Sequence, residues 1–359
     1  MPRHAANERL IDAPYNKIYN PDNSTKAQLA YDERPHGHSG YLCVYGAKGR
    51  LNNLIIQNLI GIYMARQLNR TLLADAEVSK FYDIERLSLV YPDWDYKPII
   101  PITDTNFTCQ DPQTQSPYTL NRQFTILERI EDYHNQTSTV EVAAIHNNDI
   151  WYWLGRPPEE IYERFFRALV PKQIFRTKVQ TFLDQHKLRP FSYNAVHLRF
   201  LEGYCGRFAD LCCPKLEYVL ELIIERGGTL SKPIFVATDR QCPEEVIATY
   251  TANSTDSLII MGYTGPCEGT ECAVLDFELL VLSDVFIGNI ISSVSMNVRE
   301  GRLARYGKPG LLSVLSNEKK TLDLEKTVQY LTRYWIGYWE FRKTCDQLPP
   351  RKRASAPCV

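Results

Sequence analysis

The stretch Tyr41–Ala74, YLCVYGAKGRLNNLIIQNLIGIYMARQLNRTLLA, contains the pattern that decides the fold. Tyr41–Tyr45 has the composition of a short buried strand, and Gly46–Asn53 predicts a turn. Leu54–Leu68 carries apolar residues at helical spacing, and Thr71–Ala74 predicts the next strand. A strand, a glycine-containing turn, a helix and a strand in this order form the βαβ unit of a parallel sheet.

A second series of alternating elements begins near residue 195 and predicts a second doubly wound domain. The expected strands are Ala195–Leu198, Ile234–Thr238, Leu258–Met261, Val285–Ile287 and Leu311–Leu315. The expected helices are Leu216–Arg226, Pro243–Tyr250, Cys272–Leu282 and Ser293–Tyr306.

The chain between and around these two series is less regular. Prolines between Phe81 and Asn148 predict long loops with a few irregular strands. Helical periodicity returns in Glu159–Val170 and Ile174–His186, and the second of these helices is expected to close the first domain. A last amphipathic helix is expected at about Leu324–Arg342. The predicted organisation is an arm at 1–39, a first domain at 40–190, a second domain with a C-terminal helix at 191–345, and a basic tail at 346–359.

Composition excludes several classes of partner. The chain has 359 residues, of which 44% are hydrophobic, so it can bury the cores of two domains. Its 41 basic and 42 acidic residues nearly cancel, so no global field would attract nucleic acid or an anionic membrane. The apolar runs Leu54–Met64 and Leu279–Ile291 are too short or too interrupted to span a bilayer, and we expect no transmembrane helix.

Cysteines and glycosylation sequons favour the secretory pathway. The sequence has ten cysteines without a C-x-x-C pair, and Cys267 and Cys272 flank a glycine-containing loop. Five N-x-[ST] sequons begin at Asn23, Asn69, Asn106, Asn135 and Asn253, although so short a motif also arises by chance. Met1–Glu8 lacks the apolar stretch of a signal peptide, so the chain either begins after cleavage or is cytosolic.

Polar residues gather at the expected carboxyl ends of the strands, where open parallel sheets bind ligands. Together they offer cations, hydroxyls, amides and a helix N-terminus, which is what a diphosphate needs. Each also has a structural explanation: a surface arginine, a buried core histidine, a turn-forming aspartate, or a serine that caps a helix. These residues are His197, Arg199, Asp239, Gly288, Asn289, Ser292, Ser293 and the run Gly49–Asn53.

Four segments in this order resemble the GDP-fucose protein O-fucosyltransferases, most closely the type that modifies EGF-like repeats. They are GRLNN (49–53), VHLR (196–199), FVATD (235–239) and DVFIGNIISS (284–293). The resemblance extends from Gly40 to about Tyr306. It implies an α/β fold of the GT-B type, with two Rossmann-like doubly wound domains facing a cleft. The second domain would hold most of the GDP-fucose, and the first would face the acceptor.

The resemblance also implies roles for individual residues. Arg199, which would contact the β-phosphate, and Asn53 are implied to be catalytic. His197 and Asp239 would contact the nucleoside. Donor- and acceptor-binding roles are further implied for Gly49, Arg50, Leu51 and Asn52, and phosphate contacts for Ser292, Ser293 and the backbone of Val294.

The chemistry of such a transfer explains why an arginine is wanted. Cleavage of the bond between fucose and phosphate leaves negative charge on the departing GDP, which a guanidinium stabilises without a metal ion. We therefore expect an inverting transfer with no metal. The alternative, a metal-dependent transferase with a D-x-D motif, matches Asp93-Trp94-Asp95, but prolines bracket that tripeptide and favour a turn. No carboxylate lies between Tyr45 and Asn53, so the acceptor proton is expected to pass to the leaving phosphate.

Two departures from the family pattern leave other functions open. The family loop usually reads Phe-Gly-Asn-Gln, whereas this chain has Leu51-Asn52-Asn53-Leu54. Asn52 can replace glycine if it adopts a left-handed conformation, which asparagine accepts. Val294 stands where an aromatic residue is common. The alternatives are a catalytically impaired relative that binds sugar nucleotides or glycoproteins, and a chaperone of cysteine-rich repeats. The resemblance favours EGF-like over thrombospondin-type acceptors and implies the lumen of the endoplasmic reticulum.

Overall fold

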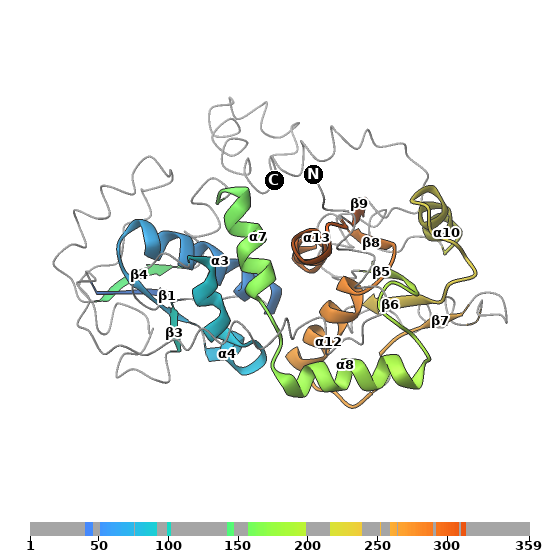
Figure 1. The fold of residues 1–359 in the computed structure, drawn as a ribbon, viewed down its shortest axis with the longest axis horizontal. Coiled ribbons are helices and arrows are strands. Elements are labelled where there is room, and N and C mark those ends of the chain that lie inside the picture. Colours follow the sequence, from blue (N-terminus) through green and yellow to red (C-terminus); the bar gives the residue numbers. More distant parts are fainter. Residues whose placement is uncertain are drawn as a thin grey trace, which may run out of the picture.

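The computed structural model describes residues 40–45, 51–74, 76–91, 99–101, 142–146, 157–198, 216–238, 252, 259–263, 265–289, 292–308 and 310–313. Within them the chain forms two parallel sheets, each covered by helices, as Figure 1 shows. The two Rossmann-like units expected from the sequence are confirmed. The boundaries that we gave to the domains stay a prediction.

The first sheet has four strands in the order β3-β2-β1-β4, and all its pairs are parallel. The predicted βαβ unit is present as β1 (Tyr41–Tyr45), α3 (Leu51–Gln67) and β2 (Thr71–Ala74). The helix α4 (Ala76–Phe81) follows β2 and was not predicted. The region Phe81–Asn148, expected to hold long loops and a few irregular strands, contains the 3₁₀ helix η2 (Ile84–Val90), β3 (Ile99–Pro101) and β4 (Val142–His146).

The second sheet has five parallel strands in the order β7-β6-β5-β8-β9. Its strands are β5 (Asn194–Leu198), β6 (Ile234–Thr238), β7 (Ile260–Met261), β8 (Phe286–Asn289) and β9 (Leu311–Ser313). Its helices include α10 (Leu216–Glu225), α12 (Thr270–Val281) and α13 (Ser293–Tyr306). The predicted helices Pro243–Tyr250 and Leu324–Arg342 lie outside the described residues.

The two faces of the second sheet are buried against different helices. Val196 and Leu198 of β5 pack with apolar residues of α10 in one cluster. The neighbouring side chain Ala195 points to the opposite face and belongs to the larger cluster that contains α12. Because successive side chains of a strand alternate between faces, strands with both faces covered read as continuous apolar runs. For this reason the strands of this domain could be recognised from their apolar runs in the sequence.

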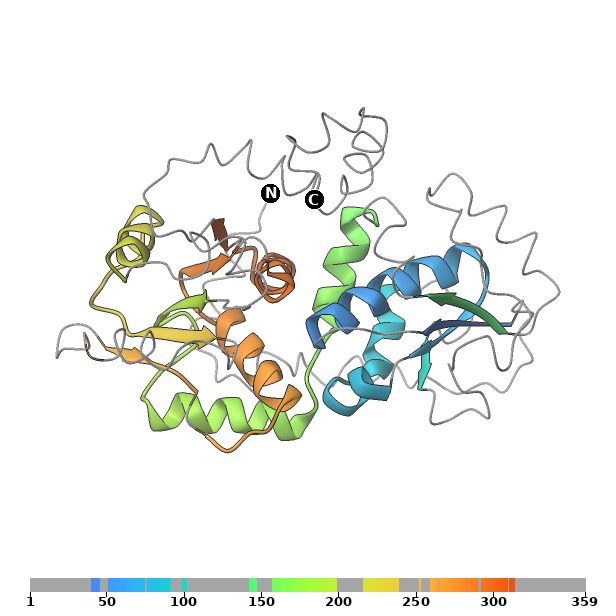
Figure 2. The same ribbon diagram turned by 180° about the vertical axis from the view of Figure 1, so that it is seen from behind.

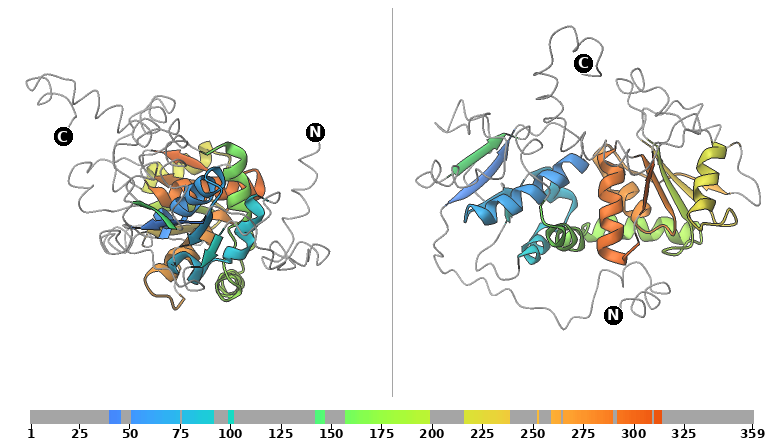
Figure 3. Two further views of the ribbon diagram at one scale, coloured as in Figure 1. Left: turned by 90° about the vertical axis from the view of Figure 1, so that its left-hand side faces the viewer. Right: turned by 90° about the horizontal axis from the view of Figure 1, so that it is seen from above.

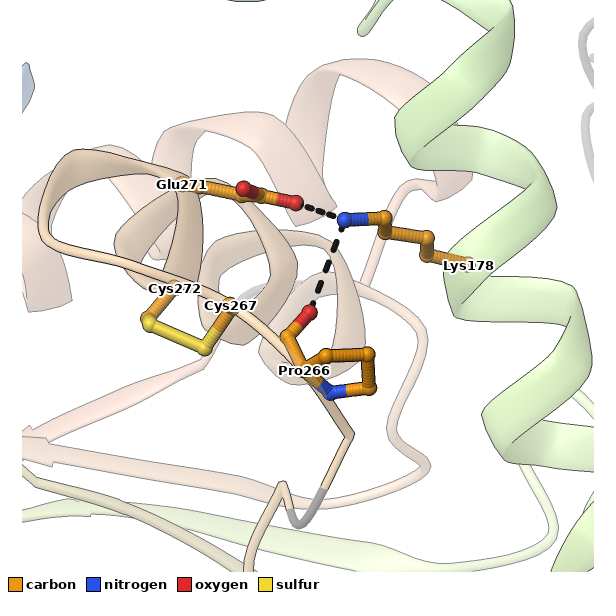
Figure 4. Close-up of a disulfide and its surroundings, with 5 residues drawn as sticks. All are labelled: Lys178, Pro266, Cys267, Glu271 and Cys272. Atoms are coloured by element: carbon orange, nitrogen blue, oxygen red, sulfur yellow. Dashed lines mark hydrogen bonds and ion pairs between the residues drawn. A yellow bond between two sulfur atoms is a disulfide. The ribbon is translucent and has the colours of Figure 1, made fainter.

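Two helices link the sheets. α7 (Glu159–Ala168) stands beside α13 between them, as Figures 2 and 3 show. α8 (Gln173–Gln185), which we expected to close the first domain, packs on the second sheet: the Phe182 ring centroid lies 5.8 Å from that of Phe235 on β6. The side chain of Lys178 on α8 also binds the carboxylate of Glu271 and the carbonyl of Pro266 (Figure 4).

Arginines fix α7 against α13. Arg167 Nε donates to the carbonyl of Ala304 at 2.8 Å, and Arg305 Nε donates to the carbonyl of Phe166 at 3.0 Å. Each bond therefore runs from one helix to a carbonyl in the last turn of the other, where carbonyls lack partners within their own helix. Arg305 Nη1 also bonds both oxygens of the fully buried Glu278 carboxylate on α12, at 2.9 and 3.1 Å.

Cys267 and Cys272 form a disulfide across the loop that precedes α12 (Figure 4). Their Cα atoms are 5.2 Å apart, and Gly269 between them has φ of 51°, in the left-handed region that glycine accepts without strain. The disulfide holds the start of α12 in the position where Glu271 binds Lys178. No helix among the described residues has the length and hydropathy that a membrane crossing requires.

Candidate functional site

The strand order of the second sheet reverses beside β5, which lies between β6 and β8. At such a switch point the connections leave the sheet in opposite directions and open a space at the carboxyl ends of the strands. His197 near the end of β5 pairs in register with Gly288 near the end of β8. α13 begins just after β8, so the histidine, the glycine and the helix N-terminus meet at one edge.

The side chain of His197 is bonded to the first turn of α13. Its Nδ1 lies 2.7 Å from the hydroxyl oxygen of Ser295, and both residues are buried. This hydrogen bond fixes the orientation of the ring, and because a serine hydroxyl can donate or accept, it is compatible with either tautomer. Burial of His197 is compatible with both interpretations of the sequence, an ordinary core histidine and a residue that contacts the nucleoside. Its place at the switch point favours the second.

Gly288 allows α13 to approach the sheet closely. A Cβ atom at this position would lie 2.7 Å from Cβ of Ser295 and 2.8 Å from the ring of Phe286. Real Cβ atoms essentially never come so near, so any other residue would push the helix away from β8. The glycine is therefore required for the contact between Ser295 and His197.

Ser292 occupies the N-cap position of α13 but does not use its side chain as a cap. Its backbone is extended, with φ of −100° and ψ of 124°, and its hydroxyl makes no capping hydrogen bond. Ser292 and Ser293 are nevertheless buried. Capping alone does not account for these serines, whereas the N–H groups of a helix N-terminus are suited to bind phosphate oxygens. The half-buried side chain of Val294 packs against the core, so only its backbone is suited to such a contact.

The residues expected in the loop after β1 lie partly in a helix. Leu51, Asn52 and Asn53 form the first turn of α3, so the prediction of a turn through Asn53 is wrong for these three positions. The left-handed conformation suggested for Asn52 is also wrong, because Asn52 is helical and has no positive φ. Leu51 is 1% exposed and belongs to the hydrophobic core, which leaves only its backbone for a substrate. Asn53 is half-buried.

Asn52 is instead buried against the second domain. Its backbone carbonyl accepts a hydrogen bond from Nδ2 of Asn297 at 2.9 Å, and its own Oδ1 accepts from the same nitrogen at 3.1 Å. Both asparagines are 2% exposed. The structure thus brings the first turn of α3 and the first turns of α13 together.

Four of the predicted site residues lie outside the described residues: Gly49, Arg50, Arg199 and Asp239. The tripeptide Asp93-Trp94-Asp95 lies outside them as well. Their roles remain predictions, although Arg199 directly follows β5 and Asp239 directly follows β6 in the chain. In the described part, no group of three or more His, Cys, Asp and Glu side chains is arranged to hold a metal ion.

Ser295 and Asn297 are two site residues that sequence reasoning missed. The available signal was the run Ser293-Val294-Ser295-Met296-Asn297, which places polar residues at alternating positions at the start of a helix. All three polar members are buried, at 5%, 0% and 2% exposure. Buried polar side chains need partners, so such a run indicates contacts with another element.

No family model matches this chain, and no curated protein matches it by sequence. Solved structures match it in fold. POFUT1 in complex with GDP aligns with a TM-score of 0.53 at 14% identity, covering 76% of this chain and 98% of that one. POFUT1 in complex with GDP-fucose gives 0.51 at 13% identity over 76% and 97%. The NodZ α-1,6-fucosyltransferase soaked with GDP-fucose gives 0.48 at 15% identity over 78% and 100%. The chain has the α/β GT-B fold of the POFUT1 structures, as the resemblance of its motifs implied.

Proposed function

We propose that this protein transfers fucose from GDP-fucose to a serine or threonine hydroxyl of an acceptor protein, with inversion and without a metal ion. The observation that carries the proposal is the bond between His197 and Ser295. It places a fixed imidazole beside the N-terminus of α13 at the switch point of the second sheet. The same fold carries GDP-fucose in the POFUT1 structure.

The donor would be held by complementary charge. The N-terminus of α13 provides N–H groups and the positive end of the helix dipole for the phosphates. Arg199, which follows β5, would add a permanent cation opposite the β-phosphate, and Asp239, which follows β6, would contact the nucleoside. Arg50 and Gly49 in the segment before α3 would face the donor and acceptor from the first domain.

The transfer requires only the donor and the acceptor. The bond between C1 of fucose and the β-phosphate oxygen breaks, and a bond between C1 and the acceptor oxygen forms on the opposite face of the sugar. The hydroxyl proton passes to the departing phosphate, while the guanidinium of Arg199 stabilises the negative charge of GDP. Asn53 at the start of α3 would orient the acceptor hydroxyl.

For the acceptor we propose an EGF-like repeat in preference to a thrombospondin-type repeat, and for the compartment the lumen of the endoplasmic reticulum. The sequons and the disulfide Cys267–Cys272 support an oxidising compartment. Incubation with GDP-fucose and each folded repeat, followed by mass spectrometry, tests the acceptor. A mass increase of one fucose on the EGF-like repeat is expected.

Arg199→Lys tests the role of the guanidinium. Lysine keeps the charge but loses the two-pronged geometry, so transfer should fall by about two orders of magnitude, comparable to the loss of one donor at an oxyanion. Arg189→Lys is the matched control, because Arg189 is exposed in the turn before β5. Full activity of Arg199→Lys would overturn the assignment. Turnover that is lost in the presence of a chelator and restored by a divalent cation would overturn the proposal of a metal-independent reaction.

The second candidate is a protein that binds GDP-fucose or glycoproteins without turnover, or a chaperone of cysteine-rich repeats. It was suggested by Asn52 in place of the family's glycine and by Val294 where an aromatic residue is common. Asn52 lies in α3 without a positive φ and accepts a hydrogen bond from Asn297, so its replacement of glycine leaves the start of the helix intact. Calorimetry with GDP together with a GDP-release assay separates the enzyme from the binding protein: binding with release indicates the enzyme, and binding without release indicates the binding protein. A chaperone of cysteine-rich repeats is compatible with either result.

A further inference from the structure

The contact between Asn52 and Asn297 joins residues that are 245 positions apart in the chain and belong to different domains. Asn297 Nδ2 donates to two acceptors of one residue, the backbone carbonyl and the side-chain Oδ1 of Asn52. Both side chains are buried, so water does not compete for these bonds. One amide therefore joins the first turn of α3 to α13 by two buried hydrogen bonds.

We infer that Asn297 is a positioning residue that holds the first turn of α3, on the acceptor side, against α13 of the nucleotide-binding domain. Asn53 directly follows Asn52, and the predicted donor contacts Gly49 and Arg50 directly precede the same helical turn. The serines at 292 and 293, which would bind the phosphates, lie in the turn of α13 that precedes Asn297. One amide thus connects the two halves of the proposed site.

The residue that replaces the family's glycine takes part in this contact. A glycine at position 52 would offer only its backbone carbonyl to Asn297, whereas Asn52 offers a second acceptor. Asn52 and Asn297 therefore act as a matched pair. This inference rests on the proposed function, since the positioning matters for catalysis only if the two halves act on one donor and acceptor.

The two hydrogen bonds between Asn297 and Asn52 predict the order in which kcat falls in a series of variants. Asn52→Ala removes one of the two bonds, because the backbone carbonyl remains, and kcat should fall about threefold. Asn297→Ala removes both bonds, and kcat should fall about tenfold or more. The double variant should resemble Asn297→Ala, because the side chain of Asn52 has lost its donor already. The Kd for GDP, which the second domain determines, should stay within about threefold throughout.

Asn58→Ala is the matched control. Asn58 is also a buried asparagine of α3, but its Nδ2 donates to the carbonyl of Leu54 within the same helix. It should lower thermal stability while kcat stays within about twofold of the wild-type value. A kcat for Asn297→Ala equal to that of Asn58→Ala would overturn the positioning role.

Hydrogen exchange gives a readout that does not depend on turnover. The amides of residues 55–58 bond to carbonyls of the first turn of α3, so they report on its opening. They should exchange several-fold faster in Asn297→Ala, and unchanged exchange would overturn the inference. If the wild type released no GDP from GDP-fucose but the exchange still rose, the proposed function would be wrong and the contact between the domains would stand.

Discussion

The hydroxyl oxygen of Ser295 lies 2.7 Å from Nδ1 of His197, and this contact joins the end of β5 to the first turn of α13. The pair is buried and lies where the strand order reverses, with Gly288 leaving just enough room for the helix. Ser295 therefore fixes the orientation of the imidazole that we propose to contact the nucleoside.

Ser295→Ala should weaken use of the donor without unfolding the protein. Loss of one hydrogen bond of about 1 kcal/mol frees the imidazole to rotate away from its fixed orientation, so kcat/KM for GDP-fucose should fall about fivefold. Steady-state kinetics with GDP-fucose measure the change. The control is Ser283→Ala, a buried serine whose hydroxyl donates to the carbonyl of Leu280 and accepts from Arg302. It should cost stability and leave kcat/KM as it is.

Gly288→Ala should move the N-terminus of α13. The added methyl group would lie 2.7 Å from Cβ of Ser295, so the helix must shift outwards and its N–H groups would move away from the proposed phosphate site. We expect the Kd for GDP to rise more than tenfold, measured by calorimetry, with far-ultraviolet circular dichroism unchanged. Gly301→Ala, within α13 itself, serves as the control, because its Cβ would come no closer than 3.4 Å to a neighbouring atom, Cγ2 of Val281. Wild-type GDP affinity in Gly288→Ala would contradict the role of this helix N-terminus.

The architecture could be predicted because its signals are local. Strand Ile234–Thr238 and helix Ser293–Tyr306 were predicted with the bounds that the structure has. Their apolar residues are buried, so the periodicity of apolar residues within each segment is enough to predict the type and bounds of the element. β3 and β4 were not located individually within the region expected to hold a few irregular strands, and β3 has only three residues and ends at a proline.

The site could be predicted only in part, because its decisive contacts are not local. Leu51-Asn52-Asn53 has the composition of a turn, and asparagine competes with helix formation through its own side chain. The helix nevertheless begins at Leu51, where Leu51 is buried in the core and Asn52 is bonded to Asn297, a partner 245 positions away. A single sequence contains no sign of that pairing, nor of the bond between Ser295 and His197.

Glu278→Gln should strongly destabilise the protein. The carboxylate is fully buried and accepts two bonds from Arg305, which also binds the carbonyls of Phe166 and Leu169 near the end of α7. Its removal leaves a buried guanidinium uncompensated, which costs about 3–5 kcal/mol. Urea unfolding measures the loss. Glu77→Gln removes the exposed ion pair with Lys80 and should change the free energy of unfolding by less than about 1 kcal/mol.

Loss of the hydroxyl group should affect the free energy of unfolding differently at two buried tyrosines. The hydroxyl of Tyr193 donates to the carbonyl of Leu279 at 2.6 Å, whereas among the described residues the buried hydroxyl of Tyr82 has no hydrogen-bond partner. At neutral pH, Tyr193→Phe should lower the free energy of unfolding by about 1 kcal/mol, because it removes a formed bond. Tyr82→Phe should leave it unchanged or raise it by up to about 1 kcal/mol, because it removes an unsatisfied polar group.

At alkaline pH, the free energy of unfolding of both phenylalanine variants should rise relative to that of the wild type. Burial raises the pKa of Tyr82 and of Tyr193 well above the ordinary value of 10.0. Above pH 10 the unfolded chain releases these protons while the folded chain keeps them, so stability is lost as pH rises. Burial lowers the pKa of Arg302 to about 10, which acts in the opposite sense, and because the charges of Arg302 and Tyr193 interact, Tyr82→Phe isolates the effect of a phenol most cleanly. Each phenylalanine variant should therefore gain stability relative to the wild type between pH 8 and about 11, measured as urea midpoints. A constant difference across that range would mean that the phenols ionise alike in the folded and unfolded chains.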